Sequence, residues 1–411
     1  MKVLWLCNIV LPELSEVFGF KKENMGGWLT GLWNCLNNES IELAICVPIR
    51  NKGRMRDGEY KNYKYYSFLI IGGETETNID EQITRFEEVL DSFNPDVIHI
   101  WGTEYEHSYS MTRAAENKDI SNKIVVNIQG LLTYYAEVYE YGMPSDIVNR
   151  VINNLTIHQG KEHFIHNSEY EKYVLKNVRN VIGRTYWDKA CTTAINEHFN
   201  YYYCGEILRN KFYESNKWNY GNCEKHSIFV SQASYPIKGF HLVISELGKL
   251  KLKYKDLVIR ISGINLLDYL TPYSEYVSEL LEKYELSDVV EFIGVQSEEE
   301  MVKNYLKANV VLSPSIIENS SNSVCEAMLI GVPVVSSFVG GMASIIDHGI
   351  SGYMYPLSEP NLMSYYIDEI FKDKNLASQI SVNAIEKAEV LNDRKKVLSD
   401  MLNIYGIIND R

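Results

Sequence analysis

The stretch NVVLSPSIIENSSNSVCEAMLIGVPVVSS (residues 309–337) begins and ends with apolar runs of strand length. Between them lie small polar residues and then the pattern of a short apolar helix, which stops at a Gly-x-Pro turn. A strand, a helix and a second strand in this order are typical of a parallel sheet buried on both faces. The stretch therefore predicts an α/β fold, and its polar loop raises the question of what Glu318 and Glu326 do there.

The same alternation of strand and helix patterns extends along the chain. Strand-like runs occur at residues 2–8, 41–48, 96–102, 123–130, 227–232, 257–263 and 289–294, and helical patterns at 107–118, 361–374, 375–389 and 392–406. A chain of 411 residues exceeds the usual size of one hydrophobic core. We therefore predict two doubly wound domains, at residues 1–205 and 226–391, joined by a linker at 206–225.

The composition excludes several classes of protein. A formal net charge of −14 leaves no basic footprint for a nucleic-acid backbone. The seven cysteines are scattered, without the spacing of a metal site. The apolar runs are shorter than the ~20 residues that a membrane span requires, and no secretory signal pattern opens the chain. We expect a cytoplasmic protein that does not bind nucleic acid.

Ligands of open parallel sheets bind at the carboxyl ends of the strands, so the loops there are the places to search for a site. In NMGGW (24–28), Gly26 and Gly27 open a helix and permit close backbone approach by an anion, although a tight turn explains them equally well. In SYPIKGF (234–240), Lys238 stands at a helix start, where it opposes the helix dipole. An anionic ligand explains that placement, and a solvated lysine is the alternative.

Two further loops complete the set. In EFIGV (291–295), Gly294 ends a strand and exposes backbone groups that suit the edge of a flat base, or it simply terminates the strand. In the opening stretch, Ser323 and Glu326 match a capping box at a helix start, which gives Glu326 a purely structural role. Glu318 lies outside that helix, beside polar residues suited to sugar hydroxyls. The loop therefore favours a ligand that is both polyhydroxylated and phosphorylated, such as a nucleotide-sugar.

Taken together, these motifs resemble the retaining, group 1 glycosyltransferases of family GT4. The resemblance rests on Lys238-Gly239, the F-x-G strand end, Glu-x7-Glu leading into EAM-x2-G-x-PVV-x-S, and VGG at 339–341. It covers nearly the whole chain. The segments DVIHIWGTE (96–104), VVNIQGL (125–131) and VIGRTYWDKA (181–190) further resemble bacterial members that build surface polysaccharides.

The resemblance implies a GT-B fold, in which two Rossmann-like domains face each other across a cleft. The C-terminal domain would bind a nucleoside-diphosphate sugar, expected to be a UDP-sugar, and the N-terminal domain a saccharide or lipid-linked acceptor. The last helix, about 392–411, would return to the N-terminal domain. Glu318 and Lys238 would be catalytic, Glu326 would bind the ribose and Gly294 the base. The remaining donor-binding residues would be Gly26, Gly27, Gln232, Asn319, Ser320, Ser321, Asn322 and Ser323.

The sequence also departs from the family pattern. Members usually carry an arginine five or six residues before the lysine, where this chain has Ala233 and Gln232. Arg184 and Arg209 are candidates to supply the missing charge. Gln129 replaces a histidine that usually follows a strand of the N-terminal domain. Because no Asp-x-Asp motif is present to hold Mg²⁺ on a diphosphate, we expect metal-independent catalysis.

Several alternatives stay open. The same fold could carry a nucleotide-sugar epimerase, or a binding-only partner of a transferase complex. Four tyrosines after IQGL could form a sugar-stacking acceptor surface or could serve in packing: Tyr134, Tyr135, Tyr139 and Tyr141. The loop VLPELSEVFGFKK (10–22) mixes apolar residues with Lys21 and Lys22 and could make weak peripheral contact with the inner membrane face. The alternative that we favour is that these apolar residues line the acceptor cleft or pack beneath it.

Overall fold

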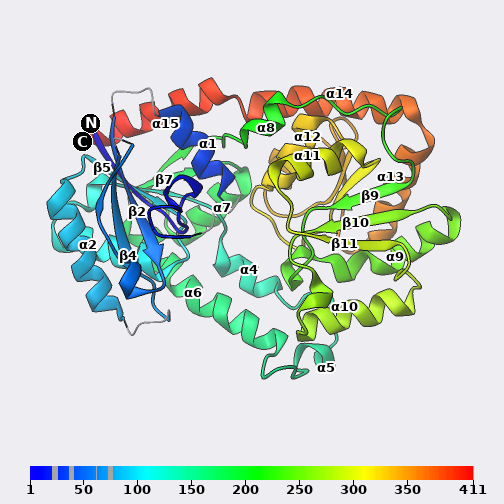
Figure 1. Cartoon of the computed structure of the whole chain (residues 1–411), viewed down its shortest axis with the longest axis horizontal. Helices are drawn as coiled ribbons and strands as arrows, with labels where there is room; N and C mark the ends of the chain where they lie inside the picture. Colours follow the sequence, from blue (N-terminus) through cyan, green and yellow to red (C-terminus); the bar gives the residue numbers. More distant parts are fainter. Residues whose placement is uncertain (21–25, 37–40, 62, 73–76, 411) are drawn as a thin grey trace. The chain divides into compact units, whose positions relative to one another are not determined.

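The computed structural model describes residues 1–20, 26–36, 41–61, 63–72 and 77–410. The chain forms two compact units (Figure 1). Unit 1 comprises Met1–Thr133, Ile165–Ile207 and Asp393–Arg411, and unit 2 comprises Tyr134–Phe164 and Leu208–Asn392. Each unit is built on its own largely parallel sheet.

The sheet of unit 1 has the strand order β3-β4-β2-β1-β5-β6-β7-β8. Its strands are β1 (Lys2–Leu6), β2 (Glu42–Ile49), β3 (Gly58–Tyr60), β4 (Tyr63–Leu69), β5 (Val97–Trp101), β6 (Ile124–Asn127), β7 (Asn180–Gly183) and β8 (Asn200–Tyr203). All neighbours pair in parallel except β3 and β4, which are antiparallel. The associated helices are α1 (Gly27–Leu36), α2 (Ile79–Phe93), α3 (Glu106–Asn117), α6 (Ile157–Asn177), α7 (Tyr186–Ile195) and α15 (Arg394–Asn409).

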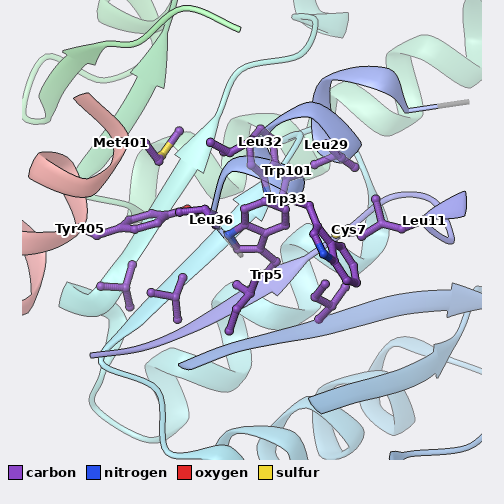
Figure 2. Close-up of a cluster of buried hydrophobic side chains, with 14 of the residues drawn as sticks. Trp5, Cys7, Leu11, Leu29, Leu32, Trp33, Leu36, Trp101, Met401 and Tyr405 are labelled. Carbon is purple, nitrogen blue, oxygen red and sulfur yellow. Dashed lines mark hydrogen bonds between the residues drawn. The ribbon is translucent and has the colours of Figure 1, made fainter. Parts of the chain in front are cut away.

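The C-terminal helix α15 is part of the core of unit 1, and Figure 2 shows Met401 and Tyr405 of this helix beside Trp5 of β1. The Trp5 indole donates to the Tyr405 hydroxyl at 2.9 Å, and His99 Nδ1 lies 2.7 Å from the same oxygen. All three side chains are fully buried. Helix α15 therefore packs on a sheet that is formed by the first half of the chain.

The sheet of unit 2 is entirely parallel and has the order β11-β10-β9-β12-β13-β14. Its strands are β9 (Ser227–Val230), β10 (Val258–Ser262), β11 (Val290–Gly294), β12 (Val310–Ser313), β13 (Val334–Ser337) and β14 (Tyr353–Tyr355). Numbered within the unit, this is the order 3-2-1-4-5-6 of nucleotide-binding doubly wound sheets. The order reverses between β9 and β12, so the expected ligand position lies at the carboxyl ends of these two strands.

Except for the first three, which precede β9 in the chain, the helices of unit 2 connect or follow its strands. They are α4 (Leu132–Val138), α5 (Ser145–Val148), α8 (Asn210–Glu214), α9 (Phe240–Lys253), α10 (Pro272–Lys283), α11 (Glu298–Lys307), α12 (Asn322–Ile330), α13 (Pro360–Lys372) and α14 (Lys374–Leu391). Two helices cross the boundary between the units. The first two residues of α4, Leu132 and Thr133, belong to unit 1, and the N-terminal part of α6 belongs to unit 2.

The division of the chain differs from the predicted boundaries at two places. Residues 134–164 cluster with unit 2 instead of the N-terminal domain, because Arg150 after α5 forms ion pairs with Glu275 and Glu279 of α10, at 2.8 and 2.5 Å. The predicted linker at 206–225 is mostly folded onto unit 2. Its Phe212 is fully buried, and its Trp218 donates to the carbonyl of Ala308 at 2.7 Å.

The loop considered for membrane contact is instead part of the core of unit 1. Leu11, Leu14 and Phe18 are at most 1% exposed, so their apolar surface does not face solvent. Lys21 and Lys22 lie outside the described residues. Among the described residues, no helix is long and apolar enough to cross a membrane.

Candidate active site

Two loops meet at the reversal point of the sheet in unit 2. After β9, a single 3₁₀ turn (Pro236–Lys238) leads into Gly239, whose φ is +66°. A side chain on Gly239 would place its Cβ 2.1 Å from the carbonyl oxygen of Pro314, in the loop that follows β12. Both the positive φ and the lack of space for a Cβ therefore require glycine at position 239. The close approach of the two loops brings Lys238 to the loop that carries Glu318.

Lys238 and Glu318 form an ion pair between these two loops. Lys238 Nζ lies 2.9 Å from Glu318 Oε2, and the hydroxyl of Ser315 donates to the same oxygen at 3.0 Å. Burial would lower the pKa of Lys238, but the adjacent Glu318 carboxylate outweighs it and raises the pKa above the ordinary value. Among the described residues, Glu318 Oε1 accepts no hydrogen bond. The site therefore offers a fixed ammonium and a carboxylate oxygen side by side.

The backbone of Glu318 is held by the glycine pair that follows β13. Gly340 has φ +50°, and a Cβ at this position would lie 2.0 Å from the carbonyl oxygen of Glu318. The amide of Gly341 donates to that oxygen at 2.9 Å. The VGG motif is therefore explained by its close backbone contact with the first glutamate.

The second glutamate has a different environment from the predicted one. Helix α12 begins at Asn322 with Ser321 as N-cap, and no side chain caps it. Ser323 lies inside the helix, with its hydroxyl 2.9 Å from Ser231 Oγ and 3.0 Å from Ser321 Oγ. The predicted capping box of Ser323 and Glu326 is therefore wrong, because Ser323 lies inside the helix and the Glu326 carboxylate pairs with Arg209.

Glu326 instead forms a two-point ion pair with Arg209. Arg209 Nε donates to Glu326 Oε1 at 2.9 Å, and Nη2 donates to Oε2 at 3.0 Å. Glu326 is 5% exposed. Burial raises its pKa to about 7, although the Arg209 guanidinium acts in the opposite direction. Arg209, one of the two candidates for the missing arginine, thus holds the second glutamate of the motif.

Gln232 and Gly294 are brought together at the carboxyl ends of β9, β10 and β11. A Cβ on Gly263, which follows β10, would lie 2.1 Å from Gln232 Oε1. The amide of Gly263 donates to the carbonyl of Gly294 at 3.0 Å. Gly294 has φ +72°, and no heavy atom lies within 4 Å of the position that its Cβ would take. The backbone at Gly294 therefore borders open space beside the sheet edge.

Four further predicted residues, Gly26, Gly27, Gln129 and Arg184, belong to unit 1, whereas Asn319 and Ser320 belong to unit 2. Gly26 has φ +72° and contacts Ile9, and α1 begins at Gly27. Gln129 donates to Asn127 Oδ1 at 3.0 Å, directly after β6. Arg184, which follows β7, is buried in an ion pair with Glu206 and donates to the carbonyl of Ile128 at 3.3 Å.

Unit 1 has a reversal point of its own, which the sequence analysis did not identify as a site. It lies between β1 and β5, where the amide of Asn8 donates to the Tyr105 hydroxyl at 3.0 Å. The neighbouring Glu104 is 7% exposed and accepts from the amide of Thr103 at 2.7 Å. Burial raises the pKa of Glu104 to about 7, and nearby Glu171 adds to the rise. A polar residue after each of two adjacent strands was the signal available in the sequence.

Metal ligands are the remaining question. In the part of the chain that the structure describes, no three His, Cys, Asp or Glu side chains are grouped closely enough to hold a metal ion.

Comparison with solved structures shows the fold. The chain is similar to sucrose-phosphate synthase from Thermosynechococcus elongatus, with a TM-score of 0.74 and 15% identity over 99% of both chains. It is also similar to HepE from Anabaena, solved in complex with UDP and glucose, with a TM-score of 0.69 and 16% identity over 99% of this chain and 100% of that one. The predicted fold of two Rossmann-like domains, the GT-B fold, is confirmed.

Comparison of sequences gives matches over part of the chain. The model for "Glycosyl transferases group 1" matches residues 212–387. An uncharacterized glycosyltransferase of Methanocaldococcus jannaschii is 30% identical over 186 residues, 45% of either protein. The putative colanic acid biosynthesis glycosyltransferase WcaL of Salmonella typhimurium is 29% identical over 36% of this chain and 37% of its own. The match thus spans less than half the length of these relatives. The matched region contains Lys238, Glu318 and Glu326, and over residues 212–387 the chain is similar to the group 1 glycosyltransferases.

Proposed function

We propose that the protein transfers a sugar from a nucleoside-diphosphate sugar to a saccharide or lipid-linked acceptor, with retention of configuration and without a metal ion. The observation that carries this proposal is the ion pair of Lys238 and Glu318 at the reversal point of the sheet in unit 2. The Lys238 ammonium suits a diphosphate, and the Glu318 carboxylate suits sugar hydroxyls. Both charges are presented where doubly wound sheets bind nucleotides.

The chemistry follows from where charge develops. In the transfer, the bond between the anomeric carbon and the diphosphate oxygen breaks, and the acceptor oxygen bonds to the same carbon. Negative charge grows on the departing diphosphate, so an ammonium fixed beside it stabilises the transition state more than the ground state. Because its pKa is raised, Lys238 stays charged at neutral pH. In front-side attack, the leaving phosphate oxygen takes the acceptor proton, and no separate nucleophile is required.

The similar proteins support a choice of donor and of pathway. HepE from Anabaena was solved in complex with UDP and glucose and in complex with UDP-glucose, and a trehalose-6-phosphate protein of Escherichia coli was solved with bound UDP-2-fluoro glucose. WcaL of Salmonella typhimurium and AmsK of Erwinia amylovora are named as glycosyltransferases of colanic acid and amylovoran biosynthesis. UDP-sugars are therefore the first donors to test, and surface polysaccharide or glycoconjugate synthesis at the inner membrane face is the proposed setting.

The test is a panel of nucleoside-diphosphate sugars, incubated with candidate acceptors in the presence of EDTA. We expect release of the nucleoside diphosphate together with a glycoside whose anomeric configuration, read by NMR, is that of the donor. Lys238→Met should abolish turnover, and Lys249→Met, which alters a lysine with a 66% exposed side chain on α9, should not. An inverted product, or activity that EDTA removes and Mn²⁺ restores, contradicts the mechanism. If the enzyme converts the donor to an epimer in the absence of an acceptor, the result contradicts the proposal of a transferase and favours an epimerase.

A further inference from the structure

Helix α4 and the turn after it lie against the loops of the donor site, although they precede those loops by about a hundred residues or more. The carbonyl of Tyr141 lies 3.0 Å from His241 Nε2, in the first turn of the helix that follows Lys238. A Cβ on Gly142 would lie 2.3 Å from a methyl carbon of Leu242. Both contacts lie within unit 2, and together they seat the turn against the start of α9.

One side chain of α4 reaches the loop that carries Glu318. The amide of Asn319 donates a hydrogen bond of 3.0 Å to the hydroxyl of Tyr135. Asn319 directly follows Glu318, and its side chain is buried. The phenol oxygen thus occupies the position that a sugar hydroxyl would take if this amide bound the donor directly.

We propose that Tyr135 is a specificity-determining residue of the donor site, where its phenol limits the size of the substituent that the transferred sugar can carry next to Glu318. This inference rests on the proposed function. A plain hexose presents a hydroxyl, which the phenol can bind. An N-acetyl group at the same place would have to displace an aromatic ring that is held by a backbone amide. The wild type should therefore prefer UDP-hexoses to UDP-N-acetylhexosamines.

Two substitutions separate the ring from the hydroxyl. Tyr135→Ala removes the ring and should shift the ratio of kcat/KM toward the N-acetylhexosamine donor by on the order of tenfold or more, which is the discrimination that pocket shape provides. Tyr135→Phe keeps the ring and should leave the N-acetylhexosamine excluded, while it slows transfer of the hexose. Tyr135→Leu serves in place of the alanine variant if that variant does not fold.

The control is Tyr141→Ala, on the same segment, whose side chain is 43% exposed and whose carbonyl contact with His241 involves only the backbone. It should leave the donor ratio unchanged. UDP affinity, measured by calorimetry, should be the same in all variants, because Tyr135 is proposed to contact the sugar. If the wild type uses hexoses and the alanine and leucine variants keep its donor ratio, the role of Tyr135 is refuted and the transferase stands. If the wild type transfers no sugar and binds no nucleotide, both proposals fail.

Discussion

Arg209 donates two parallel hydrogen bonds to the carboxylate of Glu326, with N···O distances of 2.9 and 3.0 Å. Arg209 is the second residue of unit 2 after the chain leaves unit 1 at Ile207. The glutamate that the family resemblance assigns to the ribose is therefore oriented by an arginine that lies 117 residues earlier in the chain. This arrangement gives the glutamate a fixed rotamer before any ligand arrives.

Substitution of either partner should therefore affect both folding and donor binding. Glu326→Gln leaves the partly buried Arg209 without a charged partner, and we expect a loss of about 1–3 kcal/mol in the free energy of unfolding. UDP affinity should fall as well. Arg209→Lys keeps the charge but loses the two-point geometry, so it should show a smaller loss of stability and a similar loss of affinity. Thermal unfolding and calorimetric titration with UDP measure the two effects.

A capping box would tolerate glutamine at position 326, but no capping box forms here. A glutamine variant that unfolds at the wild-type temperature would show that the pair with Arg209 contributes nothing to stability. Unchanged UDP affinity in the same variant would remove Glu326 from the donor site.

Which parts of the site were predictable depends on how far apart the interacting residues lie in the sequence. Lys238 and Glu318 could be identified because each lies in a loop after a strand, and Gly294 because it ends a strand. The carboxyl ends of parallel strands share one edge of the sheet. The Ser-x-x-Glu pattern of 323–326 failed because the helix starts at Asn322 and Arg209 competes for Glu326. No local pattern predicts that Arg209 lies beside Glu326.

The same limit explains the segment 134–164. Its helical patterns are ordinary, and nothing within it indicates that it clusters with residues beyond 208 instead of the sheet that it follows in the chain. Its assignment depends on pairs such as Arg150 with Glu275, which are more than a hundred residues apart. Tyr135 was noticed as one of four tyrosines, but only the structure separates its hydroxyl contact from the packing of Tyr139, which is 9% exposed.

Gly340 and Gly349 both have a positive φ, but only Gly340 lies against the backbone of Glu318. Gly340→Ala would place a Cβ 2.0 Å from the Glu318 carbonyl oxygen, so the loop must shift. Gly349 also has a positive φ, of +75°, but no heavy atom lies within 4 Å of its Cβ position. Both alanines carry a conformational cost of roughly 1 kcal/mol. Only Gly340→Ala should also lower kcat, by tenfold or more, while UDP still binds.

Assays of turnover and UDP titration on the two variants decide this point. Equal turnover of the two variants would show that the position of Glu318 does not depend on Gly340. Lost UDP binding in Gly340→Ala would instead assign this loop to the nucleotide. Glu318→Ala should reproduce the pattern of Gly340→Ala without the conformational cost.

The hydroxyl of Tyr405 connects α15 to the sheet of unit 1, so Tyr405→Phe should destabilise that unit. The substitution leaves the buried Trp5 indole and His99 imidazole without their shared partner, which should cost about 1–3 kcal/mol. All tryptophans except Trp218 belong to unit 1, so tryptophan fluorescence in urea reports mainly on this unit. Tyr186→Phe, at a residue that is 86% exposed, is the control. Equal midpoints for the two variants would contradict the prediction.

The stability of unit 1 should fall as the pH rises toward neutrality, because of Glu104. Its pKa is about 7 in the folded protein and near the ordinary value of 4.5 in the unfolded chain. Between these values the folded state binds more protons than the unfolded state, so unfolding becomes easier as the pH increases. The slope from this one group is at most about 1.4 kcal/mol per pH unit. Below about pH 4.5 both states are protonated and above about pH 7 both are ionised, so the effect is confined to that window.

Glu104→Gln keeps the shape of the side chain and cannot ionise. We expect it to flatten the pH dependence of the fluorescence-detected urea midpoint between pH 5 and 7 and to make unit 1 more stable than the wild type at pH 8. Glu197→Gln removes a carboxylate of the same unit that is 77% exposed, and an exposed charge of this kind contributes little to stability. Its profile should follow the wild type. If Glu104→Gln also follows the wild type, or is less stable at pH 8, the carboxyl group is ionised without cost at the reversal point of β1 and β5. In that case a favourable partner must be sought for it there.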